Sequence, residues 1–288
     1  MVAASYSTKW LKVSEPSPYV WHVELSRTPV NAFSSEYWRE YGKLFETLAE
    51  QPSDIRAVVV SSSIPKLFTA GLDLAAAAGL GEAATDSSQD AARASLAMRK
   101  VLLEFQQAIG TPERCPFPVI VAVHGLVVGL GVDLISACDI RYAASNTTFS
   151  IKEVDIGLAP DVGTLAYLPK ITGNQSLVRE LTYTGRNFSV AEADKLGLVS
   201  RVVEGGRDEV VTAALNLAKV IASKSPVAVS GAKHLITHSR DHTVAENLLY
   251  TGAWNGAALM TEDIVNNLKA MKAKQSPKFA PLKVTSKL

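Results

Sequence analysis

Short apolar runs alternate with amphipathic stretches along the first two thirds of the chain. The apolar runs at 57–61 and 119–123 are rich in valine and are bounded by polar residues or proline, which predicts buried strands. The stretches at 35–51 and 89–110 carry aromatic and aliphatic residues at helical spacing, which predicts amphipathic helices. Because strand, helix and strand follow one another, the sequence predicts an α/β fold. Further short strands are predicted at 21–25, 140–143 and 149–151.

The pattern changes near residue 226, after which every predicted element is a helix. Pro226 stands at the first position of one helix, and Thr243 with Glu246 forms a capping box that starts another. Aliphatic residues then keep helical spacing up to the tail. We therefore predict a core over 1–215 and a helical region over 216–288.

The composition limits the function classes that need to be considered. Of 288 residues, 47% are hydrophobic and 20% are charged, which is typical of a folded, water-soluble protein. The net charge of +1 argues against a nucleic-acid-binding surface. The longest apolar run, 119–132, is shorter than the roughly 20 residues of a membrane span. Cys115 and Cys138 are the only cysteines and form no paired metal motif, which indicates a reducing, intracellular compartment.

Three carboxylates stand in otherwise apolar segments that contain glycines. They are Asp133 in VVGLGVDL, Glu153 in IKEVDIGL and Asp161 in APDVGT. Carboxylates that share an apolar site are driven to different pKa values, so one can accept a proton while another donates one near neutral pH. The pattern therefore predicts proton-transfer chemistry, with helix capping by Asp133 and Asp161 as the alternative. Asp139 is interpreted as a structural residue that pairs with Arg141.

Two glycine-containing turns, at 68–74 and 124–133, follow short strands. Small residues allow the main chain to approach a ligand, and two N–H groups that converge on one carbonyl oxygen stabilise an enolate. The metal motifs DxDxDG and HExxH and the nucleophile motif GxSxG do not occur in the sequence. We therefore expect a site that works without a metal ion and without a serine nucleophile.

Longer blocks of the sequence resemble a known superfamily. FTAGLDL, ERCPFPVIVAVHGLVVGLGVDLISACDIRYAA and IKEVDIGLAPDVGTLAYLPKITGNQSLVRELTYTGR resemble successive blocks of the crotonase (enoyl-CoA hydratase/isomerase) superfamily. The resemblance extends from about Ser53 to the C-terminus, and it implies a spiral of ββα units with a C-terminal helical trimerisation region. It also implies an acyl-CoA thioester as substrate and a homotrimer or homohexamer as the assembly. No separate cofactor is implied, because coenzyme A is part of the substrate.

Acids at all three positions resemble the branch of this superfamily that isomerises 3,5-dienoyl-CoA to 2,4-dienoyl-CoA in the β-oxidation of unsaturated fatty acids. By this resemblance Glu153 is the base that removes a C2 proton, Asp161 is the acid that protonates C6, and Asp133 tunes the other two. Because C2 and C6 lie far apart on the acyl chain, two separate carboxylates suit the reaction. Enoyl-CoA hydration or Δ3-Δ2-enoyl-CoA isomerisation is the enzymatic alternative. A non-catalytic acyl-CoA-binding or RNA-binding relative is the alternative of another class.

The resemblance also assigns the backbone that binds the substrate. The N–H groups of Ala70 and Leu130 correspond to the oxyanion hole of the superfamily. The acyl-CoA site corresponds to Ala70, Gly71, Leu72, Asp73, Leu74 and Leu130.

The last three residues, Ser286-Lys287-Leu288, form the tripeptide that the peroxisomal import receptor binds at an exposed C-terminus. The sequence therefore predicts a peroxisomal protein with that receptor as a partner. A mitochondrial location is the alternative, because residues 1–12 contain serines and no acids.

Overall fold

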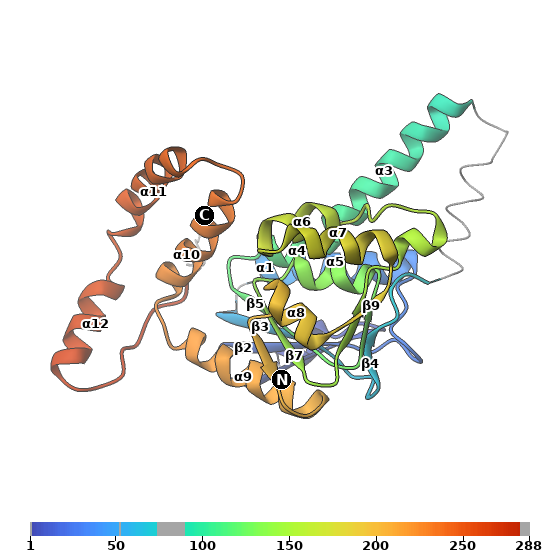
Figure 1. Ribbon diagram of the computed structural model, residues 1–288. Helices are drawn as coiled ribbons and strands as arrows, with labels where there is room; N and C mark the ends of the chain where they lie inside the picture. The colour runs from blue at the N-terminus through green and yellow to red at the C-terminus, as the bar shows by residue number, and fades with distance from the viewer. Residues whose placement is uncertain (1, 52, 74–89, 283–288) are drawn as a thin grey trace.

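The computed structural model describes residues 2–51, 53–73 and 90–282, and the strands in these ranges form two β-sheets (Figure 1). The larger sheet has the order β1 (Leu11–Ser17), β2 (Val20–Leu25), β3 (Ala57–Ser62), β5 (Val119–Val123), β7 (Ile140–Ala144) and β10 (Arg201–Val203). The smaller sheet has the order β4 (Leu67–Thr69), β6 (Leu126–Val128), β8 (Thr148–Ser150) and β9 (Asn187–Ser189). The pairs β1–β2 and β8–β9 are antiparallel, and the other neighbouring strands are parallel.

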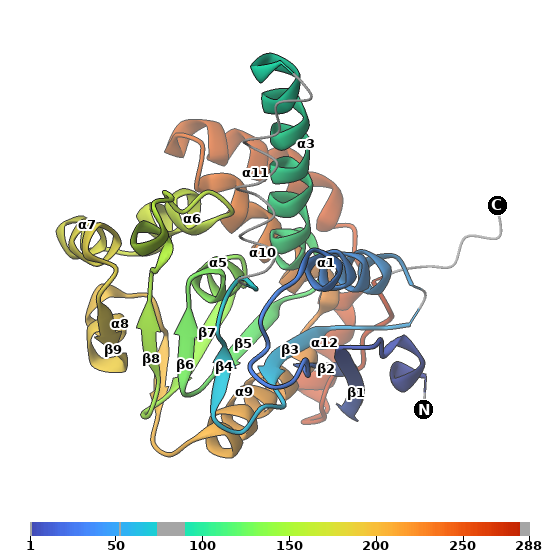
Figure 2. The same ribbon diagram turned by 90° about the vertical axis from the view of Figure 1, so that its right-hand side faces the viewer.

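Helices connect and cover these sheets (Figure 2). The N-terminal half contains the 3-10 helix η1 (Ala3–Tyr6), α1 (Ser35–Glu50), α3 (Ala91–Ile109), α4 (Thr111–Arg114) and α5 (Leu130–Ser136). The C-terminal half contains the 3-10 helix η2 (Glu153–Ile156), α6 (Thr164–Ile171), α7 (Gln175–Thr184), α8 (Val190–Leu196), α9 (Arg207–Ala222), α10 (Pro226–Ser239), α11 (Val244–Ala258) and α12 (Asp263–Lys272).

Three consecutive units share one layout, in which a strand of the larger sheet is followed by a strand of the smaller sheet and then by a helix. The units are β3-β4-α3, β5-β6-α5 and β7-β8-α6, the last with η2 inserted before its helix. Because β3, β5 and β7 pair in parallel, and β4, β6 and β8 do the same, each unit repeats the previous one beside it. The predicted α/β fold of ββα units is therefore confirmed.

All six residues of β3 are buried because the two faces of this strand belong to different hydrophobic clusters. Val58 and Val60 pack into the main core together with the apolar face of α1, whereas Ala57 and Val59 pack with α9. Side chains alternate between the two faces of a strand, so a strand covered on both faces is apolar at successive positions, as at 57–60. The strands predicted at 57–61 and 119–123 and the helices predicted at 35–51 and 89–110 are confirmed as β3, β5, α1 and α3.

Helix α9 lies against the larger sheet and belongs to the core. Its buried face is formed by Val210, Ala214 and Ala218, which pack against β3 and β5. The boundary predicted at residue 215 falls inside this helix, because an alanine-rich helix packed on a sheet has the same sequence texture as the helices that follow. The structure places the change in architecture at Pro226.

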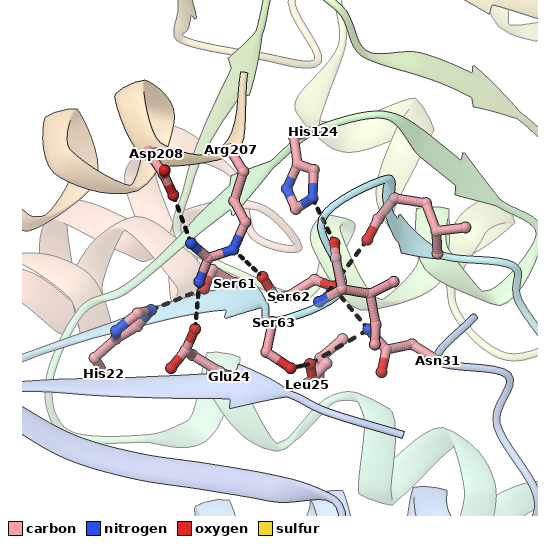
Figure 3. Close-up of polar contacts among 12 residues, drawn as sticks. His22, Glu24, Leu25, Asn31, Ser61, Ser62, Ser63, His124, Arg207 and Asp208 are labelled. Carbon is pink, nitrogen blue, oxygen red and sulfur yellow. Dashed lines mark hydrogen bonds and ion pairs between the residues drawn. The ribbon is translucent and has the colours of Figure 1, made fainter. Parts of the chain in front are cut away.

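Arg207 connects the start of α9 to the C-terminal ends of β2 and β3. Its Nε donates to the Ser62 carbonyl oxygen at 2.7 Å, and its guanidinium pairs with Glu24 at 2.5 Å and with Asp208 at 2.6 Å (Figure 3). These bonds connect α9 to β2 and β3, which shows again that α9 is part of the core.

Helices α10, α11 and α12 extend away from the sheets (Figure 1). The predicted capping box at the start of α11 is confirmed, because Thr243 and Glu246 exchange their hydrogen bonds. Many apolar side chains of α11 and α12 are exposed in the single chain, among them Leu248, Leu249, Ile264 and Leu268, as is Leu259 just after α11. Assembly through these helices into trimers or hexamers stays a prediction.

Lys233 on α10 joins the projecting helices to the core. Its ammonium group pairs with Asp139 at 2.8 Å and donates to the carbonyl oxygens of Pro112 and Phe117 at 2.8 and 3.0 Å. The predicted pairing of Asp139 with Arg141 is wrong. Arg141 instead donates to main-chain oxygens, including that of Cys138 at 2.6 Å, because a lysine remote in sequence already occupies the carboxylate.

None of the helices in the described ranges has the length and apolar character that crossing a bilayer requires. Leu74 and the tripeptide Ser286-Lys287-Leu288 lie outside the described residues.

Candidate active site

The C-terminal ends of β4 and β6 lie side by side and lead into the segments that carry the predicted site. Gly71 has φ +88°, and a Cβ added to it would lie 2.6 Å from the Val128 carbonyl oxygen and 3.6 Å from the Leu130 backbone nitrogen. Only glycine tolerates both this backbone conformation and this close approach. The two turns predicted to share a site are therefore in direct contact.

Leu130 is the first residue of α5, where the N–H groups have no partner within the helix. Within the described part of the chain its N–H forms no hydrogen bond. Its side chain is 4% exposed and packs in the main hydrophobic core. The Leu130 N–H is therefore held in place with its hydrogen-bonding capacity unused, as predicted for an oxyanion donor.

Leu72 presents the second unused N–H group. In the bridge between Phe33 and Leu72, Phe33 N–H donates to the Gly71 oxygen at 2.8 Å and Asp73 N–H donates to the Phe33 oxygen at 3.0 Å. This pattern directs the N–H of Leu72 away from the Phe33 segment, and it has no partner among the residues that the structure describes. Leu72 was predicted only as part of the acyl-CoA site.

The prediction that Ala70 supplies an oxyanion donor is wrong. The Ala70 N–H donates to the Val30 carbonyl oxygen at 3.0 Å, so it is already used in joining β4 to the segment beside it. The left-handed Gly71 turns the chain between Ala70 and Leu72. Sequence alone does not reveal which of two nearby N–H groups faces a neighbouring segment and which faces the site.

Asp133 lies in the first turn of α5 and is 2% exposed. Its Oδ1 accepts a hydrogen bond from the backbone N–H of Thr164 at 2.5 Å, at the first residue of α6. Burial raises the pKa of Asp133 to about 6, because the cost of enclosing a negative charge exceeds the stabilisation from Thr164. Asp133 therefore both joins two helices and carries a charge that changes near neutral pH.

Glu153 follows β8 and begins η2, with its carboxylate beside Gly129. A Cβ added to Gly129 would lie 3.2 Å from Glu153 Oε1. The other oxygen, Oε2, is buried and has no hydrogen-bond partner in the described ranges. Burial first of all, together with the negative charges of Asp133 and Asp161, raises the pKa of Glu153 to about 7. A buried carboxylate oxygen without a partner is suited to bind a proton.

Asp161 is exposed at the surface of the single chain, just before α6. Partial desolvation raises the pKa of its carboxyl group. Its charge also raises the pKa values of Asp133 and Glu153, so the three acids share one electrostatic environment. The structure thus brings together all three predicted acids, with Asp133 buried, Glu153 partly buried and Asp161 exposed.

Gln106 on α3 contacts this group of acids and was not predicted. Its Nε2 donates to the carbonyl oxygen of Asp161 at 2.6 Å and so connects α3 to the loop before α6. No motif surrounds Gln106 in the sequence, and only the fold brings it to Asp161. Asp73, predicted for the acyl-CoA site, pairs with Arg27 at 2.9 Å.

Across the described residues, no group of three or more histidine, cysteine, aspartate or glutamate side chains is arranged to hold a metal ion.

Comparisons with known proteins place the chain in a family. The enoyl-CoA hydratase/isomerase family model matches residues 17–280. The mitochondrial Δ3,5-Δ2,4-dienoyl-CoA isomerase of Mus musculus is 46% identical over 269 residues, covering 93% of this chain and 81% of the mouse protein. The peroxisomal Δ3,5-Δ2,4-dienoyl-CoA isomerase of Arabidopsis thaliana is 38% identical over 283 residues, covering 98% of this chain and 100% of the plant protein.

Among solved structures, an enoyl-CoA hydratase from Bacillus anthracis is similar to this fold with a TM-score of 0.82 and 27% identity. The match covers 94% of this chain and 99% of the bacterial chain, so the ββα core and the C-terminal helices are both shared.

Proposed function

This chain belongs to the enoyl-CoA hydratase/isomerase family, and we propose that it isomerises 3,5-dienoyl-CoA to 2,4-dienoyl-CoA. The observation that carries the proposal is the grouping of Asp133, Glu153 and Asp161 around two N–H groups that have no partner in the described chain. Relatives that are 38–46% identical over most of the chain are dienoyl-CoA isomerases.

The two N–H groups bind the thioester oxygen of the substrate. Leu72 and Leu130 each offer one donor, and the contact between Gly71 and Val128 holds these donors on neighbouring segments. Negative charge moves onto the thioester oxygen when C2 loses a proton, so preorganised donors stabilise the transition state more than the ground state. Removing one such donor typically costs about 10²–10³-fold in kcat.

Glu153 and Asp161 transfer protons at the two ends of the diene. Glu153 removes a proton from C2, and the electrons of that C–H bond enter a dienolate whose charge is shared by the oxygen, C2, C4 and C6. Asp161 donates its proton to C6, and the double bonds shift from the 3,5 to the 2,4 positions. The reaction leaves Glu153 protonated and Asp161 ionised, and proton exchange restores the starting state.

One proton shared between the two acids is the working state of the site. Glu153, with a pKa of about 7, holds that proton most tightly, and the reaction proceeds from the form in which Glu153 is ionised and the proton sits on Asp161. Above this pH the site loses the proton that C6 must receive, and at low pH a second proton blocks the base. The buried charge of Asp133 strengthens Glu153 as a base by raising its pKa.

Coenzyme A enters as part of the substrate, and we propose no further cofactor. The assembly that we propose is a homotrimer or homohexamer formed through α10, α11 and α12, whose exposed apolar residues would be covered by neighbouring subunits. For the location we propose the peroxisome, with import through Ser286-Lys287-Leu288. The named relatives include a peroxisomal plant protein and mitochondrial mammalian proteins, so the mitochondrion is the alternative.

Ultraviolet absorbance of a 3,5-dienoyl-CoA substrate tests the function. Isomerisation conjugates both double bonds with the thioester and increases absorbance at long wavelength, whereas hydration of a 2-enoyl-CoA removes conjugation. We expect the wild-type protein to produce the conjugated diene. Hydration of enoyl-CoA without diene isomerisation would favour the hydratase alternative, and tight binding without any turnover would favour the non-catalytic one.

The Asp161→Asn variant tests the role at C6. It is expected to abolish diene isomerisation and to leave binding of the CoA ester largely intact. Asp155→Asn is the matched control, because Asp155 is an exposed acid close in sequence that pairs with Lys152 at 2.9 Å. Full activity of Asp161→Asn would reject the proposed role of Asp161.

A further inference from the structure

Thr69, the last residue of β4, contacts the neighbours of both proposed oxyanion donors. It is 0% exposed. Its hydroxyl donates to the Asn31 carbonyl oxygen at 2.6 Å and accepts the N–H of Gly71 at 3.0 Å. Its methyl group faces α5, where a Cβ added to Gly131 would lie 2.7 Å from Thr69 Cγ2. The two ends of one small side chain therefore touch the segments on both sides of the site.

These contacts fix the two N–H groups from opposite sides. Gly71 directly precedes Leu72, so the hydroxyl of Thr69 holds the peptide that leads into the first donor. Gly131 directly follows Leu130, so the methyl group of Thr69 limits how closely β4 approaches the start of α5. The hydroxyl therefore fixes the direction of the Leu72 N–H group, and the methyl group fixes the separation between β4 and the start of α5.

The anchor of the Thr69 hydroxyl is itself rigid. Asn31 is 0% exposed, and its amide nitrogen donates to Ser62 Oγ at 2.8 Å (Figure 3). The same nitrogen donates to the Phe68 carbonyl oxygen at 2.9 Å. Its Oδ1 accepts the N–H of Arg27 at 2.8 Å. A buried amide with this many partners cannot turn without breaking several hydrogen bonds, so the Asn31 carbonyl oxygen is a fixed reference for Thr69.

We propose that Thr69 is a positioning residue that sets the direction and the separation of the Leu72 and Leu130 N–H groups. The inference rests on the proposed function of this site. It assigns Thr69 no contact with the reacting atoms, because the side chain is enclosed between β4 and α5.

Two variants separate the contributions of the hydroxyl and the methyl group. Thr69→Val keeps the branched shape and removes the hydroxyl, which leaves the Gly71 N–H and the Asn31 oxygen without their partner. Thr69→Ser keeps the hydroxyl and removes the methyl group. We expect kcat of Thr69→Val to fall by about 10- to 100-fold with little change in KM. We expect kcat of Thr69→Ser to fall less, because this variant keeps the hydroxyl bonds and loses only the methyl contact with α5. Thr182→Val is the control, since Thr182 is a buried threonine on α7.

A second readout does not depend on turnover. Bound 2,4-hexadienoyl-CoA, polarised by two N–H donors at its thioester oxygen, should absorb at longer wavelength than the free ester. Thr69→Val should lose much of this red shift, Thr69→Ser should lose a smaller part of it, and Thr182→Val should keep all of it. A merely structural Thr69 would lower the unfolding temperature and leave both kcat and the red shift of the folded enzyme unchanged, which would overturn the proposal.

The two readouts distinguish failure of this inference from failure of the proposed function. A wild-type red shift that Thr69→Val loses, without isomerase activity, would support the role of Thr69 and reject the isomerase. If isomerase activity and the red shift both survive in Thr69→Val, the isomerase function is supported and the positioning role of Thr69 is rejected. The absence of a red shift in the wild-type protein would overturn the positioning role, because there would be no polarising donors to place.

If Thr69→Val does not fold, Gly131→Ala tests the contact from the other side. The added methyl group would collide with Thr69 Cγ2 and push β4 and α5 apart, so kcat and the red shift should both fall. Combining Gly131→Ala with Thr69→Ser removes Thr69 Cγ2, the atom that the new methyl group would meet. The combined variant should therefore regain part of kcat and part of the red shift. Failure of the combined variant to recover either quantity would contradict the proposal.

Discussion

The carboxylate of Glu153 lies directly against the backbone of Gly129. A Cβ added at Gly129 would be 3.2 Å from Glu153 Oε1, and Gly129 itself has φ +52° and ψ −117°. Gly129, which directly precedes the Leu130 donor, therefore also lies against the carboxylate of Glu153, the proposed base. The backbone at Gly129 therefore fixes the position of the Glu153 carboxylate relative to the Leu130 N–H group.

We expect Gly129→Ala to reduce both stability and activity. A side chain in this backbone conformation costs roughly 1–3 kcal/mol, and its methyl group would displace the Glu153 carboxylate from C2 of the substrate. Thermal unfolding and kcat measure the two effects separately.

Gly197→Ala is the control for Gly129→Ala. Gly197 also has positive φ, at +81°, but an added Cβ would meet no atom closer than 3.9 Å. This variant should lose stability and keep the wild-type kcat. Equal kcat values for the two variants would contradict the placement of Glu153.

The pH profile of kcat/KM should be bell-shaped, with its alkaline limb near the Glu153 pKa of about 7. Above that pH the site loses the shared proton. Asp133→Asn removes a negative charge that raises the Glu153 pKa, so this limb should move to lower pH. A limb that stays in place in Asp133→Asn would refute the coupling of these two acids.

Glu153→Gln should lower kcat by about 10²–10⁴-fold, because an amide cannot accept the C2 proton. Exchange of the C2 proton with deuterated water, followed by nuclear magnetic resonance, should be lost as well. Exchange at the wild-type rate would show that another group removes this proton.

Asp133→Asn should stabilise the folded protein at pH 8. The folded-state pKa of Asp133, about 6, is raised above that of an exposed aspartate, so the folded state binds more protons than the unfolded state between these values. Stability of the wild type therefore falls as the pH rises through this interval, by up to roughly 3 kcal/mol.

Chemical denaturation of wild type and Asp133→Asn from pH 5 to pH 8 measures this effect. The advantage of the variant should shrink as the pH falls, because the wild-type aspartate becomes neutral. Asparagine still offers an oxygen to the Thr164 N–H, so this contact is retained. A constant difference across the pH range would show that burial of the Asp133 charge is not the cause.

Lys233→Met should destabilise the protein by about 1–3 kcal/mol, since it removes the cation that pairs with the partly buried carboxylate of Asp139. Burial raises the pKa of Asp139 and Lys233 lowers it, so the loss should be largest at neutral pH. The double variant Lys233→Met/Asp139→Asn should recover part of the stability in thermal unfolding. If the double variant is no more stable than Lys233→Met, the lost pairing with Asp139 is not the cause of the destabilisation.

The sequence by itself determined the layout of the chain. Valine-rich runs and helical spacing located β3, β5, α1 and α3, because burial on one or both faces imposes a period on apolar residues. The three acids could also be identified from the sequence, because ionisable groups in apolar segments are costly to bury and are typical of functional sites. The boundary at 215 failed because the alanine-rich face of α9 resembles the helices after it, although it packs on the sheet.

Only the tertiary structure decided which main-chain groups face the site and which partners the charges have. Ala70 and Leu72 are two residues apart, yet one N–H is bound to Val30 and the other is directed away from its neighbour. Asp139 pairs with Lys233, which lies far along the chain, and Gln106 reaches Asp161 from another helix. Hydrophobic periodicity is a local property of the chain, whereas hydrogen-bond partners are chosen by segments that meet only when the sheets have formed.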